Sequence, residues 1–175
     1  MKKYSATLSN WAKAVFMLIA ISTAGCTGYR VGSMLPPKYQ TVAVPTFINE
    51  SGEPFLQNPT TSAAISEFQI DGSLKIADIK TADTILTAKL TGFSLRPIRF
   101  SADRGRQANE YRMYINASIT LTDRETGKVL VENPSIQGMA DFIVSGDMSS
   151  SKKNALPEAS KDLAHKIVEK IVEVW

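Results

Sequence analysis

Four arginines form the densest group of side chains in this sequence that could hold an anionic ligand. They lie within eleven positions, and Asp103 is the only acid among them. A guanidinium group donates paired hydrogen bonds to phosphate, so the group is a candidate site for a phosphorylated ligand. The alternative is a solvated loop with scattered charge. The four residues are Arg96, Arg99, Arg104 and Arg106.

The sequence lacks the residue patterns on which enzymatic catalysis usually depends. His165 is the only histidine, so nucleophilic catalysis of the Ser-His type would have one base to draw on. The sequence contains no Gly-x-Ser-x-Gly elbow and no glycine-rich phosphate loop. Asp123 and Glu125 fall in a predicted turn, and one histidine with one cysteine does not suit a zinc site. We therefore expect no enzymatic activity, no cofactor and no metal, and we assign His165 to solvent.

Cys26 is the one residue whose position predicts a covalent modification. The 25 residues before it hold three lysines and no acid, then an apolar run at 14–21, then the small residues Ser22-Thr23-Ala24-Gly25. This order is typical of a cleavable secretion signal, and the apolar run is about half the ~20 residues that a membrane-spanning helix needs. Ala24-Gly25-Cys26 resembles the lipobox of bacterial lipoproteins, although Thr23 stands where that motif usually has an aliphatic residue. The alternatives are a retained anchor helix and a buried structural cysteine.

Removal of residues 1–25 would leave 150 residues, enough for one domain with a sizeable core. Three of the 20 basic residues lie in the signal, which leaves 17 bases against 17 acids and no net charge. Nucleic acid is therefore not an expected partner. We predict a signal peptide at 1–25, a lipidated tether at 26–39 and one domain at 40–175. The thirteen residues between Cys26 and Gln40 reach about 45 Å at most, which keeps the domain near the membrane.

The elements that would position these groups follow from the hydrophobic pattern. Gln40–Phe47 is β-branched and predicts a first strand, with Pro45 at an edge or end. A helix is expected from Pro59, with Asn58 as its cap, to Gly72. A short strand at 74–79 and a long strand at 84–100, broken near Pro97, come next.

The strongest β pattern lies at 112–122, where apolar and polar residues alternate strictly. This alternation predicts an antiparallel sheet with one buried and one wet face. The buried set is Met113, Ile115, Ala117, Ile119 and Leu121. A turn with Gly127 leads to a fifth strand at 129–144, which Asn133-Pro134 and Gly138 should bend or bulge.

The C-terminal segment is the strongest helix. We predict a polar linker at 149–154, in which Lys152-Lys153 is a weaker candidate for anion binding, and then a helix from Pro157 with a wide apolar stripe. The stripe holds Leu163, Ala164, Ile167, Val168, Ile171, Val172 and Trp175. The predicted order is β-α-β-β-β-β-α. It indicates an α+β two-layer sandwich with a mostly antiparallel sheet of four to five strands and two amphipathic helices.

Several short motifs resemble the lipopolysaccharide-assembly lipoprotein family LptE. Gly28-Tyr29 follows the cysteine, Val42-Ala43-Val44-Pro45 precedes the first helix, and Ala82-Asp83 leads into the long strand. The resemblance covers the whole mature chain in order and spacing. It implies an outer-membrane lipoprotein on the periplasmic side that plugs the LptD β-barrel, assists its assembly and contacts lipopolysaccharide in transit.

Two other function classes stay open beside this one. A regulatory lipoprotein that activates a cell-wall synthase could use the same fold, and a lipid-anchored hydrolase is the third possibility. Three aromatic residues, Phe100, Tyr111 and Tyr114, are candidates either for contact with a barrel wall or for packing within the sheet.

Overall fold

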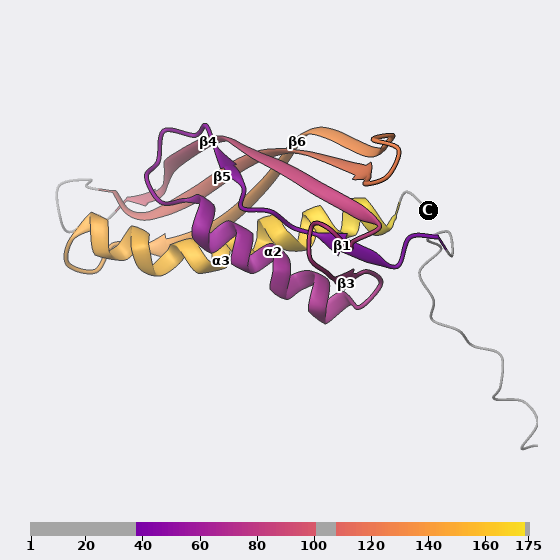
Figure 1. Cartoon of the computed structure of the whole chain (residues 1–175). Helices are drawn as coiled ribbons and strands as arrows, with labels where there is room; N and C mark the ends of the chain where they lie inside the picture. The colour runs from indigo at the N-terminus through magenta and orange to yellow at the C-terminus, as the bar shows by residue number, and fades with distance from the viewer. Residues whose placement is uncertain (1–37, 101–107, 174–175) are drawn as a thin grey trace, which may run out of the picture. The chain divides into compact units, whose positions relative to one another are not determined.

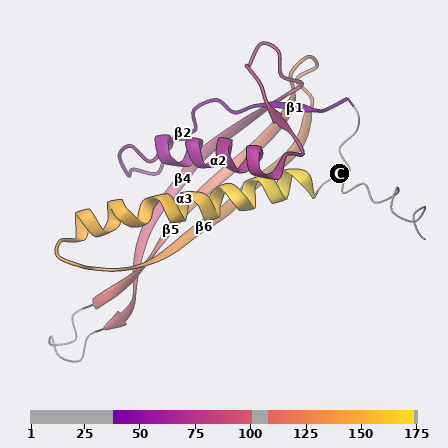
Figure 2. The same cartoon turned by 90° about the horizontal axis from the view of Figure 1, so that it is seen from below.

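The computed structural model describes residues 38–100 and 108–173. Two helices lie side by side against one face of a six-stranded sheet, and the other face of the long strands is open (Figures 1 and 2). The α+β two-layer prediction is confirmed. The elements are β1 (Thr41–Ala43), β2 (Ile48–Asn49), α2 (Gln57–Asp71), β3 (Lys75–Ile76), β4 (Thr84–Phe100), β5 (Ala108–Asp123), β6 (Val129–Ile143) and α3 (Met148–Val172).

The sheet is mixed rather than purely antiparallel. Its order is β3-β1-β4-β5-β6, with β2 also paired to β4. The long strands β4, β5 and β6 pair in antiparallel fashion, whereas β1 is parallel to β3 and β4, and β2 is parallel to β4. The parallel part arises because α2 returns the chain to the edge from which it came. Of the strand predicted at 40–47, only Thr41–Ala43 forms β1, which ends before Pro45, a residue that cannot donate to a ladder. β2 lies just beyond the predicted range.

The alternation predicted for β5 is present. All five predicted core residues are buried, and Asp123 continues the same parity at 2% exposure. A register shift between Ala117 and Ile119, opposite Asn133 and Ile136, confirms the bulge near Pro134. The long strand predicted at 84–100 is present with these bounds, and the break expected near Pro97 is a register shift between Pro97 and Arg99. Such a bulge accommodates the missing N–H without ending the pairing.

Helix α2 begins earlier than predicted. Its N-cap is Leu56, without a side-chain hydrogen bond, so the assignment of Asn58 as the cap was wrong and Pro59 lies within the first turn. Proline is tolerated there because the first N–H groups of a helix have no intrahelical partner. The helix ends as predicted at Gly72, which adopts a φ of 74°.

The predicted linker at 149–154 is helical, which is the largest error in the sequence-based assignment. Helix α3 begins at Met148, where the Asp147 side chain accepts a hydrogen bond from the Ser150 backbone N–H at 2.8 Å. The Ser151 hydroxyl donates to the Asp147 carbonyl at 2.9 Å and is buried. Capping and burial therefore outweigh the turn preference of the serines, and Pro157 lies inside the helix.

Strand β6 and α3 cross at Gly138. A Cβ atom at this position would lie 2.5 Å from Leu163 Cβ and 2.7 Å from the Ala159 carbonyl oxygen. The interruption predicted at Gly138 is therefore a close helix–strand contact and not a bulge. Beside it, the Met139 N–H donates to Asp162 at 2.8 Å and Lys166 donates to the Gln137 carbonyl at 3.0 Å. These contacts fix the position of α3 along the sheet.

Candidate functional site

The far ends of β4 and β5, Arg96–Phe100 and Ala108–Arg112, form what we call the hairpin end. Two of the four predicted arginines lie here. Arg96 lies over the Tyr114 ring, with its guanidinium carbon 5.1 Å from the ring centroid. Arg99 forms an ion pair with Glu110 at 3.1 Å. Arg104 and Arg106 lie outside the described residues, so the structure brings together only half of the predicted cluster.

Apolar side chains are exposed around these arginines. Ile98, Phe100 and Ile143 expose 42%, 58% and 64% of their surfaces. Tyr111, on the opposite face of β5, stacks on Phe142 at a centroid distance of 6.0 Å and is half-buried. Tyr111 therefore packs within the sheet, Tyr114 is half-buried beneath Arg96 on the other face, and Phe100 is exposed. Basic and apolar groups adjoin one another, as in surfaces that contact anionic amphiphiles.

A groove of about 730 Å³ opens between the N-terminal halves of α2 and α3. Its apolar walls come from both helices and from β4. Lys152 and the exposed Lys153 line it, and so does Phe93, three residues before Arg96. The apolar lining residues are Pro54, Phe55, Pro59, Phe93, Leu156 and Pro157.

The two lysines of the groove differ in what they already contact. Lys152 forms an ion pair with Glu53 at 2.6 Å, and its ammonium lies 5.7 Å from the centroid of the Phe93 ring. Lys153 is exposed and forms no ion pair with a described residue. Phe55 projects beside them with 78% of its surface exposed and a φ of 61°, a conformation that costs a non-glycine residue energy. Lys153 is thus the cation of the groove that an incoming anion could bind without displacing a partner.

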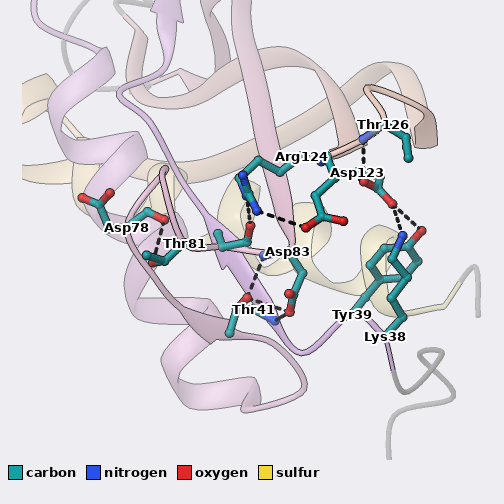
Figure 3. A network of polar contacts seen from close by, with 11 residues as sticks. Lys38, Tyr39, Thr41, Asp78, Thr81, Asp83, Asp123, Arg124 and Thr126 are labelled. Atoms are coloured by element: carbon teal, nitrogen blue, oxygen red, sulfur yellow. Dashed lines mark hydrogen bonds and ion pairs between the residues drawn. The ribbon is translucent and has the colours of Figure 1, made fainter.

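At the opposite end of the sheet, two carboxylates hold the start of the described chain. The Asp123 carboxylate accepts hydrogen bonds from Lys38 Nζ at 2.6 Å and from the Tyr39 hydroxyl at 3.0 Å (Figure 3). Its other oxygen accepts from the backbone N–H groups of Glu125 and Thr126 at 2.9 and 3.0 Å. Asp123 therefore joins the β5–β6 turn to the segment that precedes β1.

Asp83 is the second carboxylate. One of its oxygens accepts from the backbone N–H groups of Gln40 and Thr41, both at 3.0 Å, and from the Thr41 hydroxyl at 2.7 Å. Arg124 connects the two acids, because its N–H donates to the Asp83 carbonyl at 3.0 Å and its side chain to the Ala82 carbonyl at 2.6 Å. We call Asp83, Asp123 and residues 38–41 the carboxylate clamp.

These contacts shift the pKa values of the groups involved. The hydrogen bond from Lys38, followed by that from the Thr126 N–H, holds the pKa of Asp123 far below its usual range. The Gln40 N–H, followed by the Thr41 side chain, lowers the pKa of Asp83. The hydrogen bond to Asp123 raises the pKa of Lys38 in turn. Both acids are therefore ionised at neutral pH.

The remaining predicted residues are placed as follows. His165 is mostly exposed, as expected, but its Nδ1 lies 2.8 Å from a Glu67 carboxylate oxygen, so it links α3 to α2. Cys26 and Trp175 lie outside the described residues. Within the part of the chain that the structure describes, no three metal-binding side chains come together and no helix is long and apolar enough to cross a membrane.

Sequence reasoning missed the groove and the clamp for different reasons. The groove needs the first two turns of α3, which the sequence pattern assigned to a linker. The clamp left one readable trace: Asp123 stands in the buried parity of Met113 to Leu121, where an acid must find partners. Nothing in the sequence indicates that Lys38 and Tyr39 supply them.

The family model LptE, described as "Lipopolysaccharide-assembly", matches residues 39–171, which cover both helices and all six strands. The chain belongs to the LptE family. The match begins at Tyr39, within the clamp, and so includes Asp83, Asp123 and clamp residues 39–41. Membership confirms the resemblance inferred from the short motifs and assigns the chain to lipopolysaccharide assembly at the level of the family. No curated protein matches the chain in sequence.

Solved structures share the fold at low sequence identity. The hypothetical protein CT253 from Chlamydia trachomatis is 11% identical, with a TM-score of 0.52 over 78% of this chain and 97% of that one. Protein XCC0632 from Xanthomonas campestris is 13% identical, with a TM-score of 0.52 over 83% and 92%. At these identities the likeness concerns the fold alone.

Proposed function

We propose that this LptE-family chain is an outer-membrane lipoprotein, anchored by lipid on Cys26 at the periplasmic side, that plugs an LptD-type β-barrel and contacts lipopolysaccharide. The observation that carries the ligand part is the amphiphilic groove with its margin of lysines. No catalytic role is proposed, because a plug binds and positions without a reaction.

The open face of the sheet supports the barrel part of the proposal. On its central strand β5, the residues of this face from Thr122 back to Asn116 are uncharged and polar. On the neighbouring strand β6, Gln137 donates a hydrogen bond to Asn116 at 2.8 Å. Barrels of the outer membrane have polar interiors, so this row of β5 suits such surroundings. The neighbouring rows add Lys89, paired with Glu50 at 3.6 Å, and Glu132 opposite Thr120. The residues on β5 are Thr122, Thr120, Ser118 and Asn116.

The groove supports the ligand part. Lipid A of lipopolysaccharide is a phosphorylated, acylated glycolipid, and the groove combines apolar walls with Lys153 at the rim. An acyl chain in the groove would place a phosphate near the lysines. Arg96 and Arg99 lie at the same end of the sheet but project from the hairpin rather than into the groove, so they would contact a ligand separately.

Binding of purified lipopolysaccharide tests this assignment. We expect Lys153→Ala to weaken binding by roughly tenfold, the loss of one charge-assisted contact of ~1.5 kcal/mol. Arg99→Ala should cost less, because Arg99 must leave Glu110 to reach a ligand. Lys128→Ala, an exposed lysine at the opposite end, is the matched control. If the Lys153 and Lys128 variants bind equally, the groove is not the site.

Co-purification tests the partner. The full chain with Cys26 intact should bring down a large outer-membrane β-barrel. An arginine variant of the hairpin end or a lysine variant of the groove should still do so. Recovery of a cell-wall synthase instead would support the regulatory alternative. Absence of palmitate label on Cys26 would contradict the lipid anchor.

A further inference from the structure

The carboxylate clamp lies where the chain enters the folded domain, twelve residues after Cys26. If Cys26 is lipidated, every pull of the membrane on the domain passes through Lys38. Strand β1, which follows at once, has three residues and pairs with β3 and β4 at two positions each. So short a strand would open readily at its free end if the tether pulled on it directly.

The clamp stands between the tether and that strand. Lys38 and Tyr39 are held on Asp123, and Gln40 and Thr41 on Asp83, so each of the four residues before or at the start of β1 contacts a carboxylate. The contacts are reciprocal, because the Asp83 N–H donates to the Thr41 hydroxyl at 2.8 Å and the Thr84 hydroxyl to the Thr41 carbonyl at 2.9 Å. Asp123 is no loose surface contact, since it is 2% exposed, and Asp83 is half-buried.

We infer that the carboxylate clamp is the joint that transmits force between the lipid tether and the domain, and that it makes the β5–β6 turn the membrane-proximal end. This inference rests on the lipid anchor of the proposed function. The hairpin end, with the groove and the arginines, is then the membrane-distal end. Asp123 and Arg112 are eleven residue steps apart along β5, and at a rise of ~3.4 Å per step the distance between them is about 37 Å.

The tether is short enough to preserve this polarity. Twelve residues reach at most about 43 Å, close to the length of β5, and any path short of full extension brings Lys38 nearer to the anchor. The turn end therefore stays closer to the anchoring leaflet than the hairpin end does on average. A ligand bound at the hairpin end would be held away from that leaflet.

Hydrogen exchange of residues 38–44 tests the joint. The lipidated protein in vesicles of phosphatidylethanolamine and phosphatidylglycerol is compared with the Cys26→Ala chain in solution. In the wild type the two should exchange alike, because the clamp absorbs the tether's motion. In the Asp83→Asn, Asp123→Asn double variant, exchange should rise roughly tenfold, and further in the anchored protein than in the free one. Ile167→Val, which loosens the core elsewhere, controls for general loss of stability.

Two results would overturn the proposed joint: unchanged exchange in the double variant, or equal exchange in its anchored and free forms.

The orientation of the domain is tested separately. A fluorophore is attached to the new cysteine of the Lys128→Cys or the Ile143→Cys variant, and a quencher is placed in the lipid headgroups. The label at 128, in the turn, should be quenched more strongly, and equal quenching would refute the orientation. Vesicle flotation reports on the lipid anchor itself. A chain that does not float refutes the proposed anchor and, with it, the transmission of force through the clamp. Exchange in the free chain still shows whether the carboxylates hold residues 38–41.

Discussion

Replacement of Gly138 by alanine should destabilise the domain and disturb the groove at the same time. The added Cβ would lie 2.5 Å from Leu163 Cβ and 2.7 Å from both the Leu163 nitrogen and the Ala159 carbonyl oxygen. Two of these three atoms belong to the α3 backbone, so no side-chain rotation relieves the clash. Helix α3 must move away from β6, and the hydrogen bond from the Met139 N–H to Asp162 would stretch with it.

The expected magnitude follows from overpacking of a close-packed core, which costs about 1–3 kcal/mol. Loss of the Met139–Asp162 contact would add about 1 kcal/mol. At roughly 4 °C per kcal/mol for a domain of this size, the thermal midpoint should fall by about 8–16 °C for a total near 2–4 kcal/mol. Urea unfolding followed by circular dichroism would measure the same loss independently.

Gly92→Ala is the matched control for this prediction. There the new Cβ would meet Asn116 Nδ2 at 3.2 Å, at the end of a side chain that can turn away. We expect less than about 1 kcal/mol for that variant. A Gly138→Ala protein as stable as the Gly92→Ala protein would refute the view that α3 is locked onto β6 at this crossing. Because the N-terminal half of α3 forms one wall of the groove, lipopolysaccharide binding should also weaken in the Gly138 variant alone.

Two ion pairs or hydrogen-bonded groups should make the thermal stability depend on pH, one near neutrality and one in acid. The hydrogen bond to Glu67 raises the pKa of His165, so this pair stabilises the fold below the unfolded pKa of about 6.5, and the stabilisation is lost as pH rises through the folded pKa. Because His165 is mostly exposed, His165→Gln should lower the thermal midpoint only slightly at pH 6 and not at all at pH 9. The backbone N–H of Gln40 lowers the pKa of Asp83, so the stabilisation by Asp83 is present above about pH 3.9 and is lost as pH falls through the folded pKa. Asp83→Asn should therefore lower the thermal midpoint at pH 7, and the two proteins should unfold alike in acid. A difference in thermal midpoint that stays constant with pH would contradict this assignment.

Much of the fold could be predicted because its long elements carry strong periodic patterns. The alternation in β5 placed five core residues and the wet face correctly, and the apolar stripe of α3 placed Leu163, Ile167 and Ile171 in the core. The short strands could not be placed in this way. β2 and β3 have two residues each, too few for a period, and their parallel pairing is set by the path of α2.

The functional ends were predicted less well, because they depend on contacts between distant parts of the chain. Arg99 stood in an apparently basic cluster, yet Glu110 on the next strand pairs with it. Lys152 was assigned to a linker, but its ion pair with Glu53 spans 99 positions in the sequence. Local composition indicates the charge that a segment carries, whereas the partner that neutralises it is fixed only by the fold.

The buried acid of β5 shows how such a contact can couple the anchor to the domain. A carboxylate at a core position cannot remain ionised without partners, and its own turn supplies only two backbone N–H groups to one of its oxygens. The other oxygen depends on Lys38 and Tyr39, the last two residues of the predicted tether. Docking of the tether's end and completion of the β5–β6 turn therefore stabilise one another. The same carboxylate that closes a hairpin of the sheet thus determines the end of the sheet at which a lipid-anchored chain would enter.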